Sequence, residues 1–536
     1  MAKFCAKTKV AGAVLVVWNL LIAASAFGNT ITVDNLFDSG PGSLRDAIAS
    51  ASAGDTIDVN VAGAITLTSG TLFIRKDQTI LGPGPSTLAI VGNNSSRILT
   101  IADVGTATVA ISGLAIRNGN ADFGGGIVNG GTLTLTNSIV SGNAASFYGG
   151  GIYNETAARM TIGNSVVSGN SAPVGGGIAN HDGTLSLSSS TVSGNSANGM
   201  YGSGGGIYNG GLGGSVDVTT STVSYNSASG QGGGIYIGSG TLSVVNSTVS
   251  NNSSSCNSGG CSGGGGIYNH QSTAVISNCT LSDNVSLLGG SLISLYGTTT
   301  LTHSILAKGA SGSNCFTYST PDAIVSHGYN LSDDASCSAF LFEPGDLNDV
   351  AAGLSPDGLQ DNGGPTQTIA LLVTSPAVDA VPLGACTDAN GQPITDQRGI
   401  SRTEGTACDS GAFELHREPP AYIAQVQQPI NADGSSIFNS NRGVVPAKFT
   451  LAYGGTATCQ LPPATISLFR TNGTVMGPIS ESAYVLTADS GSSFRVAEDG
   501  CQYVYNLATS SLGTGTYAVF ISIDSAIVGK GMFGLK

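Results

Sequence analysis

Apolar and small polar residues alternate along the middle of the chain, and the alternating pattern repeats. Within each repeat every second residue is apolar, which is typical of a strand with one buried face. A Gly-Gly-Gly-Ile element marks each repeat, and successive copies begin 25 to 32 residues apart. The copies lie at 124–127, 149–152, 175–178, 204–207, 232–235 and 264–267, with a degenerate copy at 289–292. Such self-similarity indicates a solenoid in which each repeat forms one coil.

Aligning the copies places like residues in columns. The apolar columns are Ile127, Ile152, Ile178, Ile207, Ile235 and Ile267; Leu135, Ile162, Leu187, Val218, Val244 and Ile276; and Val140, Val167, Val192, Val223, Val249 and Leu281. Three short strands per repeat, each supplying one column, predict a parallel β-helix with coils about 4.8 Å apart. The glycine triplets suit its corners, because glycine allows positive φ angles and close backbone approach.

One asparagine recurs at the same place in each coil. These residues are Asn143, Asn170, Asn195, Asn226, Asn252 and Asn284. Stacked amides can donate to one neighbour and accept from the other, so we expect a hydrogen-bonded ladder. The column is therefore predicted to be structural.

Composition agrees with an all-β chain. Glycine makes up 79 of the 536 residues, and only 10% of residues are charged, against roughly 25% charged residues in average proteins. These values exclude a helical protein or an ordinary α/β enzyme. The net charge of -14 argues against nucleic acid as a partner, because phosphate binding needs clustered Lys and Arg.

The N-terminus has the features of an export signal. Three lysines among the first nine residues precede an apolar run from Val10 to Ala23, and Ala24-Ser25-Ala26 gives a cleavable small-x-small pattern. Residues 1–26 are therefore predicted to be a signal peptide, with no transmembrane domain after cleavage. The alternative is an uncleaved membrane anchor, although the apolar run is short for a membrane span.

Cleavage would leave nine cysteines in a compartment that permits disulfides. Neighbours in sequence suggest four pairs, with Cys279 left over. The pairs are Cys256 with Cys261, Cys315 with Cys337, Cys386 with Cys408, and Cys459 with Cys501. The short interval between Cys256 and Cys261 predicts a protruding loop closed at its base.

The chain resembles the secreted right-handed parallel β-helix proteins of bacteria, the pectin-lyase-like solenoids. Ser39–Ile48 looks like the N-terminal cap of that group, in which a short amphipathic helix covers the first coil. Four later motifs closely match the choice-of-anchor Q domain: Asp361–Thr368, Ser375–Asp379, Asp396–Gly399 and Cys408–Glu414. That resemblance implies a secreted or surface location and a domain that ends the β-helix, without implying a reaction.

The last segment loses the repeat and reads as a small antiparallel β-sandwich. Val445–Phe449 resembles the motif of the PxKF domain, an immunoglobulin-like module of exported bacterial proteins. The expected organisation is a signal peptide at 1–26, a cap at 27–60, and β-helix repeats at 61–345. A choice-of-anchor Q-like region at 346–418 then closes the helix, and a PxKF-like sandwich follows at 419–536.

Chemistry on the coils is sparse. A polysaccharide lyase or glycoside hydrolase on this fold would need clustered carboxylates, yet residues 104–310 contain only five acids and three bases. The best candidate for acid/base catalysis is Glu155 with His181 and Asp182, since the alignment puts the first two on successive coils. The alternative is a solvated turn with an incidental ion pair.

Four tyrosines form a candidate binding column. Tyr153, Tyr208, Tyr236 and Tyr268 each follow the inward isoleucine of their repeat, so they should face outward together. They predict either a platform for sugar rings or a self-stacking ladder that only stabilises the sheet. Val128 and Ala179 interrupt the column.

Acidic residues concentrate after the repeats, with 15 acids and three bases between residues 320 and 418. Calcium binding at these turns is one interpretation, and turn formation with solubility is the other; no metal site or other cofactor is predicted. We therefore expect a monomeric, secreted or surface protein that binds polysaccharide or cell-surface glycan without catalysis. The alternative is a polysaccharide lyase or glycoside hydrolase on the same fold.

Overall fold

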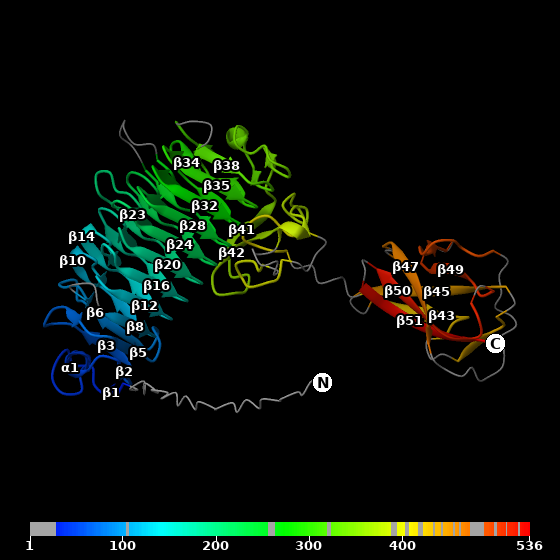
Figure 1. Cartoon of the computed structure of the whole chain (residues 1–536), viewed down its shortest axis with the longest axis horizontal. Coiled ribbons are helices and arrows are strands. Elements are labelled where there is room, and N and C mark those ends of the chain that lie inside the picture. Colours follow the sequence, from blue (N-terminus) through cyan, green and yellow to red (C-terminus); the bar gives the residue numbers. More distant parts are fainter. Residues whose placement is uncertain are drawn as a thin grey trace, which may run out of the picture. The chain divides into compact units, whose positions relative to one another are not determined.

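The computed structural model describes residues 28–536 except 103–106, 256–262, 319–322, 387–393, 403–406, 416–421, 432–434, 441–442, 454–455, 460–461, 472–486, 498–500, 511 and 524–525. The predicted signal peptide and the Cys256–Cys261 loop lie outside the described residues. The chain divides into two compact units, Met1–Leu415 and His416–Lys536. The first unit is a parallel β-helix of about eleven turns, so the predicted fold is confirmed (Figure 1).

Two long sheets carry the second and third apolar columns. Sheet A consists of β1 (Thr30–Val33), β2 (Asp55–Val59), β5 (Gln78–Leu81), β8 (Thr108–Ser112), β12 (Thr132–Thr136), β16 (Arg159–Gly163), β20 (Thr184–Ser188), β24 (Ser215–Thr219), β28 (Thr241–Val245), β32 (Thr273–Ser277), β35 (Thr298–Thr302) and β38 (Ile324–Ser326). Sheet B consists of β3 (Gly63–Thr66), β6 (Leu88–Val91), β9 (Ala115–Arg117), β13 (Ile139–Ser141), β17 (Val166–Ser168), β21 (Thr191–Ser193), β25 (Thr222–Ser224), β29 (Thr248–Ser250), β33 (Thr280–Asn284), β36 (Ile305–Lys308), β39 (Leu331–Ser332) and β40 (Leu347–Asn348).

A third sheet carries the isoleucine column, and a fourth was not predicted. Sheet C consists of β4 (Leu72–Ile74), β7 (Leu99–Ile101), β11 (Ile127–Asn129), β15 (Ile152–Asn154), β19 (Ile178–His181), β23 (Ile207–Gly210), β27 (Ile235–Ile237), β31 (Ile267–His270), β34 (Gly289–Leu295) and β37 (Ser313–Phe316). Sheet D consists of β10 (Asn120–Phe123), β14 (Ala144–Tyr148), β18 (Ser171–Ala172), β22 (Ser196–Ala197), β26 (Ser227–Ala228) and β30 (Ser253–Ser254). Most strands of sheet D have only two residues, too few to show a period.

The pairing register follows the sequence alignment. Ile152 pairs with Ile178, Leu187 with Val218, and Val192 with Val223. All these side chains are fully buried in one continuous core. The registers therefore confirm the three columns, because a slip of one residue would turn every apolar side chain outward.

The glycine triplets sit where the coils approach most closely. Gly149 has a φ of +66°, a conformation that L side chains rarely adopt. A Cβ on Gly151 would lie 2.7 Å from the carbonyl oxygen of Gly177 on the next coil. Larger residues would therefore force adjacent coils apart.

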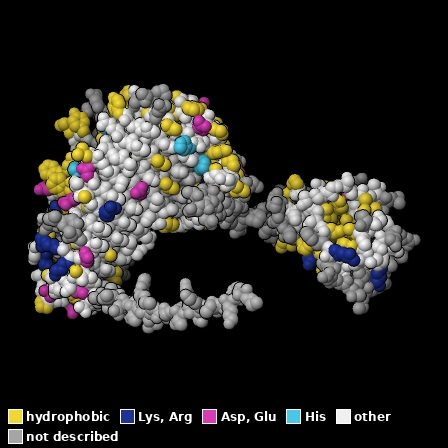
Figure 2. Space-filling view, viewed as in Figure 1, with side chains coloured by type: hydrophobic (Ala, Val, Ile, Leu, Met, Phe, Trp, Pro, Cys, Tyr) yellow, Lys and Arg dark blue, Asp and Glu magenta, His cyan; other side chains and the backbone are white. Residues whose placement is uncertain are grey.

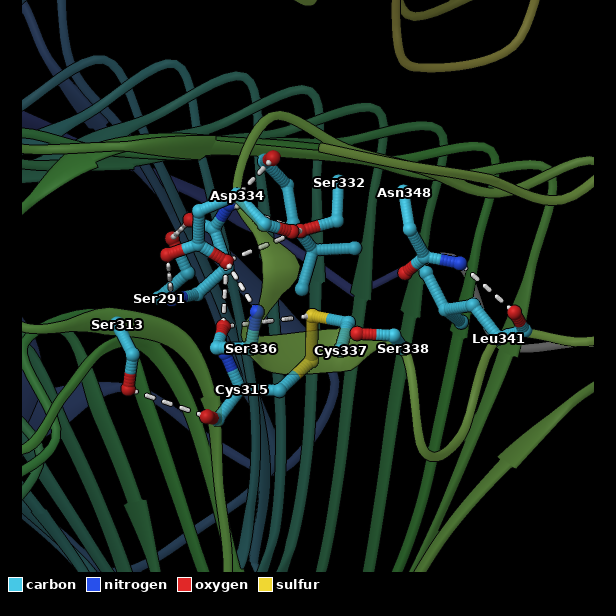
Figure 3. The surroundings of a disulfide bond; sticks show 12 residues. Ser291, Ser313, Cys315, Ser332, Asp334, Ser336, Cys337, Ser338, Leu341 and Asn348 are labelled. Atoms are coloured by element: carbon cyan, nitrogen blue, oxygen red, sulfur yellow. Dashed lines mark hydrogen bonds between the residues drawn. A yellow bond between two sulfur atoms is a disulfide. The ribbon is translucent and has the colours of Figure 1, made fainter. Parts of the chain in front are cut away.

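Short segments cover both ends of the core. At the N-terminal end, α1 (Leu44–Ser50) buries Leu44, Ala47 and Ile48 against the first coils. At the other end, η2 (Ala335–Cys337) brings Cys337 into the core, where it is disulfide-bonded to Cys315 of β37 (Figure 3). Leu341 adds a buried side chain beside them.

The described residues of the segment 350–415, called the strap below, return along the side of the β-helix over sheet B. The strap contains β41 (Leu354–Gln360), β42 (Thr368–Leu371) and η3 (Leu383–Ala385). Its Gln397 accepts a hydrogen bond from Thr248 Oγ1 and donates to Thr222 Oγ1, residues of two earlier coils. The segment expected to close the helix thus lies mainly on its flank, and the end is closed by residues ahead of it.

Three of the predicted disulfides form within the described residues: Cys315–Cys337, Cys386–Cys408 and Cys459–Cys501. Cys279 is free and buried. It takes the place of a serine in a column that includes Ser247 and Ser304, and its backbone N–H donates to Ser304 Oγ. Burial raises the pKa of the Cys279 thiol to about 12, so the leftover cysteine is an inert core residue.

The second unit is a two-layered β-sandwich. One sheet contains β43 (Tyr422–Gln427), β45 (Val444–Tyr453), β46 (Thr456–Thr458), β48 (Arg495–Val496) and β49 (Tyr503–Ala508). The other contains β44 (Ser436–Phe438), β47 (Ala464–Thr471), β50 (Gly515–Ile523) and β51 (Ala526–Leu535), and its β44–β51 pair is parallel. Val445, Ala447 and Phe449 of β45 point into the core between the layers.

Candidate functional site

The outward side of sheet C carries one connected group of rings. The aromatic face consists of Phe123, Phe147, Tyr148, Tyr153, Tyr208, Tyr236, Tyr268 and Tyr296, with His181 and His270. Neighbouring ring centroids lie 5.2 to 6.5 Å apart. That range is within the spacing at which aromatic rings interact.

Strand register creates the central part of the aromatic face. Tyr208 pairs with Tyr236, which pairs with Tyr268. Their rings are nearly parallel, with centroids 5.3 Å apart for the first pair and 5.4 Å for the second. Gly210 and Gly238, two residues downstream of Tyr208 and Tyr236, leave room for those two rings, since a Cβ on Gly210 would overlap the Tyr208 hydroxyl.

The four predicted tyrosines differ in accessibility. Tyr153, Tyr208 and Tyr236 are half-buried, but Tyr268 is only 2% exposed. Ile293 and Leu295 pack around Tyr268, and Gln231 Nε2 donates a hydrogen bond to its hydroxyl at 3.0 Å. Tyr268 therefore ends the column as a core residue and cannot contact a ligand directly.

Sheet D supplies rings that the sequence alignment missed. Tyr148 lies 6.0 Å from Tyr208, centroid to centroid, so it bridges the position where Ala179 interrupts the column. Phe123 is 5.2 Å from Tyr153 and 5.6 Å from Phe147. Phe123 and Tyr148 each come directly before a Gly-Gly-Gly-Ile element, a shared position that could have revealed them.

The hydroxyls of Tyr153, Tyr208 and Tyr236 stay protonated at neutral pH. Burial raises the pKa of Tyr208 above its ordinary value, and Tyr148 and Asp182 add to the shift. Burial also raises the pKa of Tyr153 and of Tyr236. The face therefore offers neutral hydroxyls as hydrogen-bond donors and acceptors beside apolar ring surface.

The predicted trio of Glu155, His181 and Asp182 is divided between two environments. His181 Nδ1 lies 3.7 Å from Asp182 Oδ2 and 3.5 Å from Thr156 Oγ1. The Asp182 carboxylate accepts hydrogen bonds from the backbone N–H groups of Leu212 and Gly213, so it also holds the next coil's loop.

The Glu155 carboxylate lies beside Gly130 of the preceding coil. It lines an open cavity of about 350 Å³ with Arg97, Phe73, Phe123 and Tyr153. Burial lowers the pKa of Arg97, and the negative charges of the nearby Glu155 and Asp122 partly offset this shift. The Arg97 side chain donates to the carbonyl oxygen of Phe123 at 2.9 Å and fixes one wall.

Acidic side chains after the repeats hold turns together. Asp334 accepts hydrogen bonds from Ser336 and Asn314 (Figure 3). Asp346 accepts from Asn330 N at 2.9 Å and from Ser326 Oγ at 2.6 Å. Among the described residues, no three His, Cys, Asp or Glu side chains are grouped to hold a metal ion.

In the part of the chain that the structure describes, no helix is long and apolar enough to cross a bilayer. Comparison with protein-family models, curated proteins and solved structures gave no significant match. The resemblances to the choice-of-anchor Q and PxKF domains therefore remain predictions from the sequence.

Proposed function

We propose that this chain is an exported β-helix protein that binds glycans, at the cell surface or outside the cell, through the aromatic face of sheet C. The single observation that carries the proposal is the connected group of accessible rings that runs from Phe123 through Tyr148 and Tyr208 to Tyr236. A ligand made of repeating units can contact several coils at once, because the coils themselves repeat. Apolar ring surface next to neutral hydroxyls also suits sugars, which present both C–H and O–H groups.

Export and attachment form the second part of the proposal. The segment 1–26 would direct secretion, and three disulfides among the described residues fit an oxidising compartment. The choice-of-anchor Q-like region at 346–418 and the PxKF-like sandwich at 419–536 would serve surface display. The proposal assigns attachment to these modules and leaves the β-helix face for the ligand.

Catalysis by a polysaccharide lyase or glycoside hydrolase has less support. Such enzymes place two carboxylates, or a carboxylate and a base, around one reacting bond. Glu155 faces Arg97 and Gly130, while His181 faces Asp182 and Thr156. Glu155 is also the only carboxylate among the described residues that line its cavity.

Retention on a panel of immobilised polysaccharides tests the aromatic face. The double variant Tyr208→Ala, Tyr236→Ala should bind its glycan about tenfold more weakly, because each ring contributes roughly 0.5–1.5 kcal/mol. Alanine is compatible with the column, since Ala179 occupies the same register position in the preceding coil.

Tyr225→Asn is the matched control. Tyr225 is 57% exposed on the turn after β25 and has a φ of +56°, the same φ as Asn251 at this position in the next coil. The control should bind like the wild type. Full retention by the double variant would contradict the proposed location of the site.

A further inference from the structure

A second cavity opens where the N-terminal cap meets sheet C. It has a volume of about 290 Å³ and lies between α1 and β4. Arg45, Arg75 and Lys76 line it, and none of its lining residues, all within the described chain, carries a carboxylate. Figure 2 shows Lys and Arg side chains gathered at the N-terminal coils, at the lower left of the view.

The three cations have different roles. Arg45 belongs to the wall, because it pairs with Asp38 at 2.6 Å and donates to the carbonyl oxygens of Gly70 and Thr71. Arg75 and Lys76 are exposed. The Arg75 guanidinium lies over the Phe73 ring at 4.7 Å, and Lys76 Nζ donates to the carbonyl oxygen of Ala51. Both side chains line the cavity and bring positive charge to it.

This cavity is continuous with the aromatic face. Phe73 lines both this cavity and the one formed by Arg97, Phe123 and Tyr153. Phe73 is also 44% exposed and shares the outward register of Val128 and Tyr153 through Thr100. A chain-like ligand that lies along the tyrosines would therefore reach Arg75 and Lys76 at its end.

We propose that the ligand is an acidic polysaccharide and that Arg75 and Lys76 bind its carboxylate or sulfate groups, with Phe73 beside the sugar ring. This inference rests on the proposed glycan-binding function and names the ligand's chemical class. The chain has a net charge of -14, yet this cavity is lined by three cations and by no carboxylate among its described lining residues. Charge pairing at this position would select anionic sugars from neutral ones.

Matched pairs of polymers test the charge requirement. Polygalacturonate is compared with its methyl ester, and dextran sulfate with dextran, so that each pair differs only in the anionic group. The full-length mature protein should bind at least one anionic member ten or more times more tightly than its neutral partner. The two pairs distinguish a carboxylate from a sulfate, and the preference should weaken as salt is raised.

The double variant Arg75→Gln, Lys76→Gln should lose this preference, with about tenfold weaker binding of the anionic polymer. Arg159→Gln, Lys308→Gln is the control, because it removes the same charge from exposed positions on sheets A and B. Equal losses in both variants, or no loss in the first, would overturn the acidic-ligand inference. Retention of neutral polymers alone would overturn it and leave glycan binding intact, whereas no retention of any polymer would overturn both proposals.

Discussion

Single polar residues hold the coils together inside the β-helix. Asn195 donates to Asn226 Oδ1 at 2.9 Å, and Asn170 donates to Asn195 Oδ1 at 2.9 Å, as the predicted ladder requires. A second buried ladder runs through Asn129, Asn154, Asn180 and Asn209. The sequence analysis missed this ladder. Each of its residues lies two positions after an inward isoleucine and so faces the core, where a polar side chain is not expected unless stacked partners satisfy it.

Removing one member of the first ladder should destabilise the β-helix strongly. Asn195→Ala leaves the backbone N–H of Asn170 without its acceptor and removes one donor from the carbonyl oxygen of Val167. The unsatisfied buried N–H together with the lost amide hydrogen bonds should lower the free energy of unfolding by about 3 kcal/mol. Denaturant unfolding followed by circular dichroism measures the change. The exposed Asn198→Ala in the same coil is the control, and equal effects would show that the ladder contributes little.

Among the elements, the strap is the one whose packing against sheet B could not be predicted from the sequence. Its motifs could be recognised, but their role depends on contacts between residues far apart in the chain, such as Thr222 with Gln367 and with Gln397, which lie 145 and 175 positions away. Arg402 is fully buried, lies 3.5 Å from Glu414 Oε2, and donates to the carbonyl oxygens of Asp409 and Gly411. The alternation of apolar and polar residues along a strand cannot predict this network, because Arg402 and Glu414 both lie outside the repeats.

His303 makes the contact between the strap and the β-helix sensitive to pH. Its carbonyl oxygen accepts a hydrogen bond from Gly411 N, and its side chain is 8% exposed. Burial, with a smaller contribution from Arg402, lowers the pKa of His303 to about 4. An unfolded histidine has a pKa of about 6.5. Protonation therefore favours the unfolded form increasingly as pH falls from about 6.5 to about 4.

The loss of stability between pH 7 and pH 5 should be smaller by about 1–2 kcal/mol in His303→Asn than in the wild type. Asparagine is suitable because Asn278 holds the equivalent position in the preceding coil, with a φ of +52° against +47° for His303. Denaturant unfolding at the two pH values provides the measurement. An identical pH dependence in both proteins would rule out His303 as its source.

At the scale of the whole molecule, repetition made the β-helix predictable. Each apolar column reappears from coil to coil, so a strand position that is ambiguous in one coil can be assigned from the others. The aromatic face was only partly predicted, since Tyr148 comes from sheet D and depends on the path of the corner between two sheets. Tyr268 was expected to be accessible, and packing by Ile293 and Leu295 from a later coil, outside its repeat, buries it.

We propose above that the β-helix binds a glycan without cleaving it. Incubation of the mature protein with a polysaccharide panel, scored for retained polymer and for new chain ends, tests the claim most directly. We expect retention of at least one polymer with no increase in chain ends. New chain ends that disappear in Glu155→Ala or His181→Ala would contradict the claim and identify the protein as a polysaccharide-cleaving enzyme.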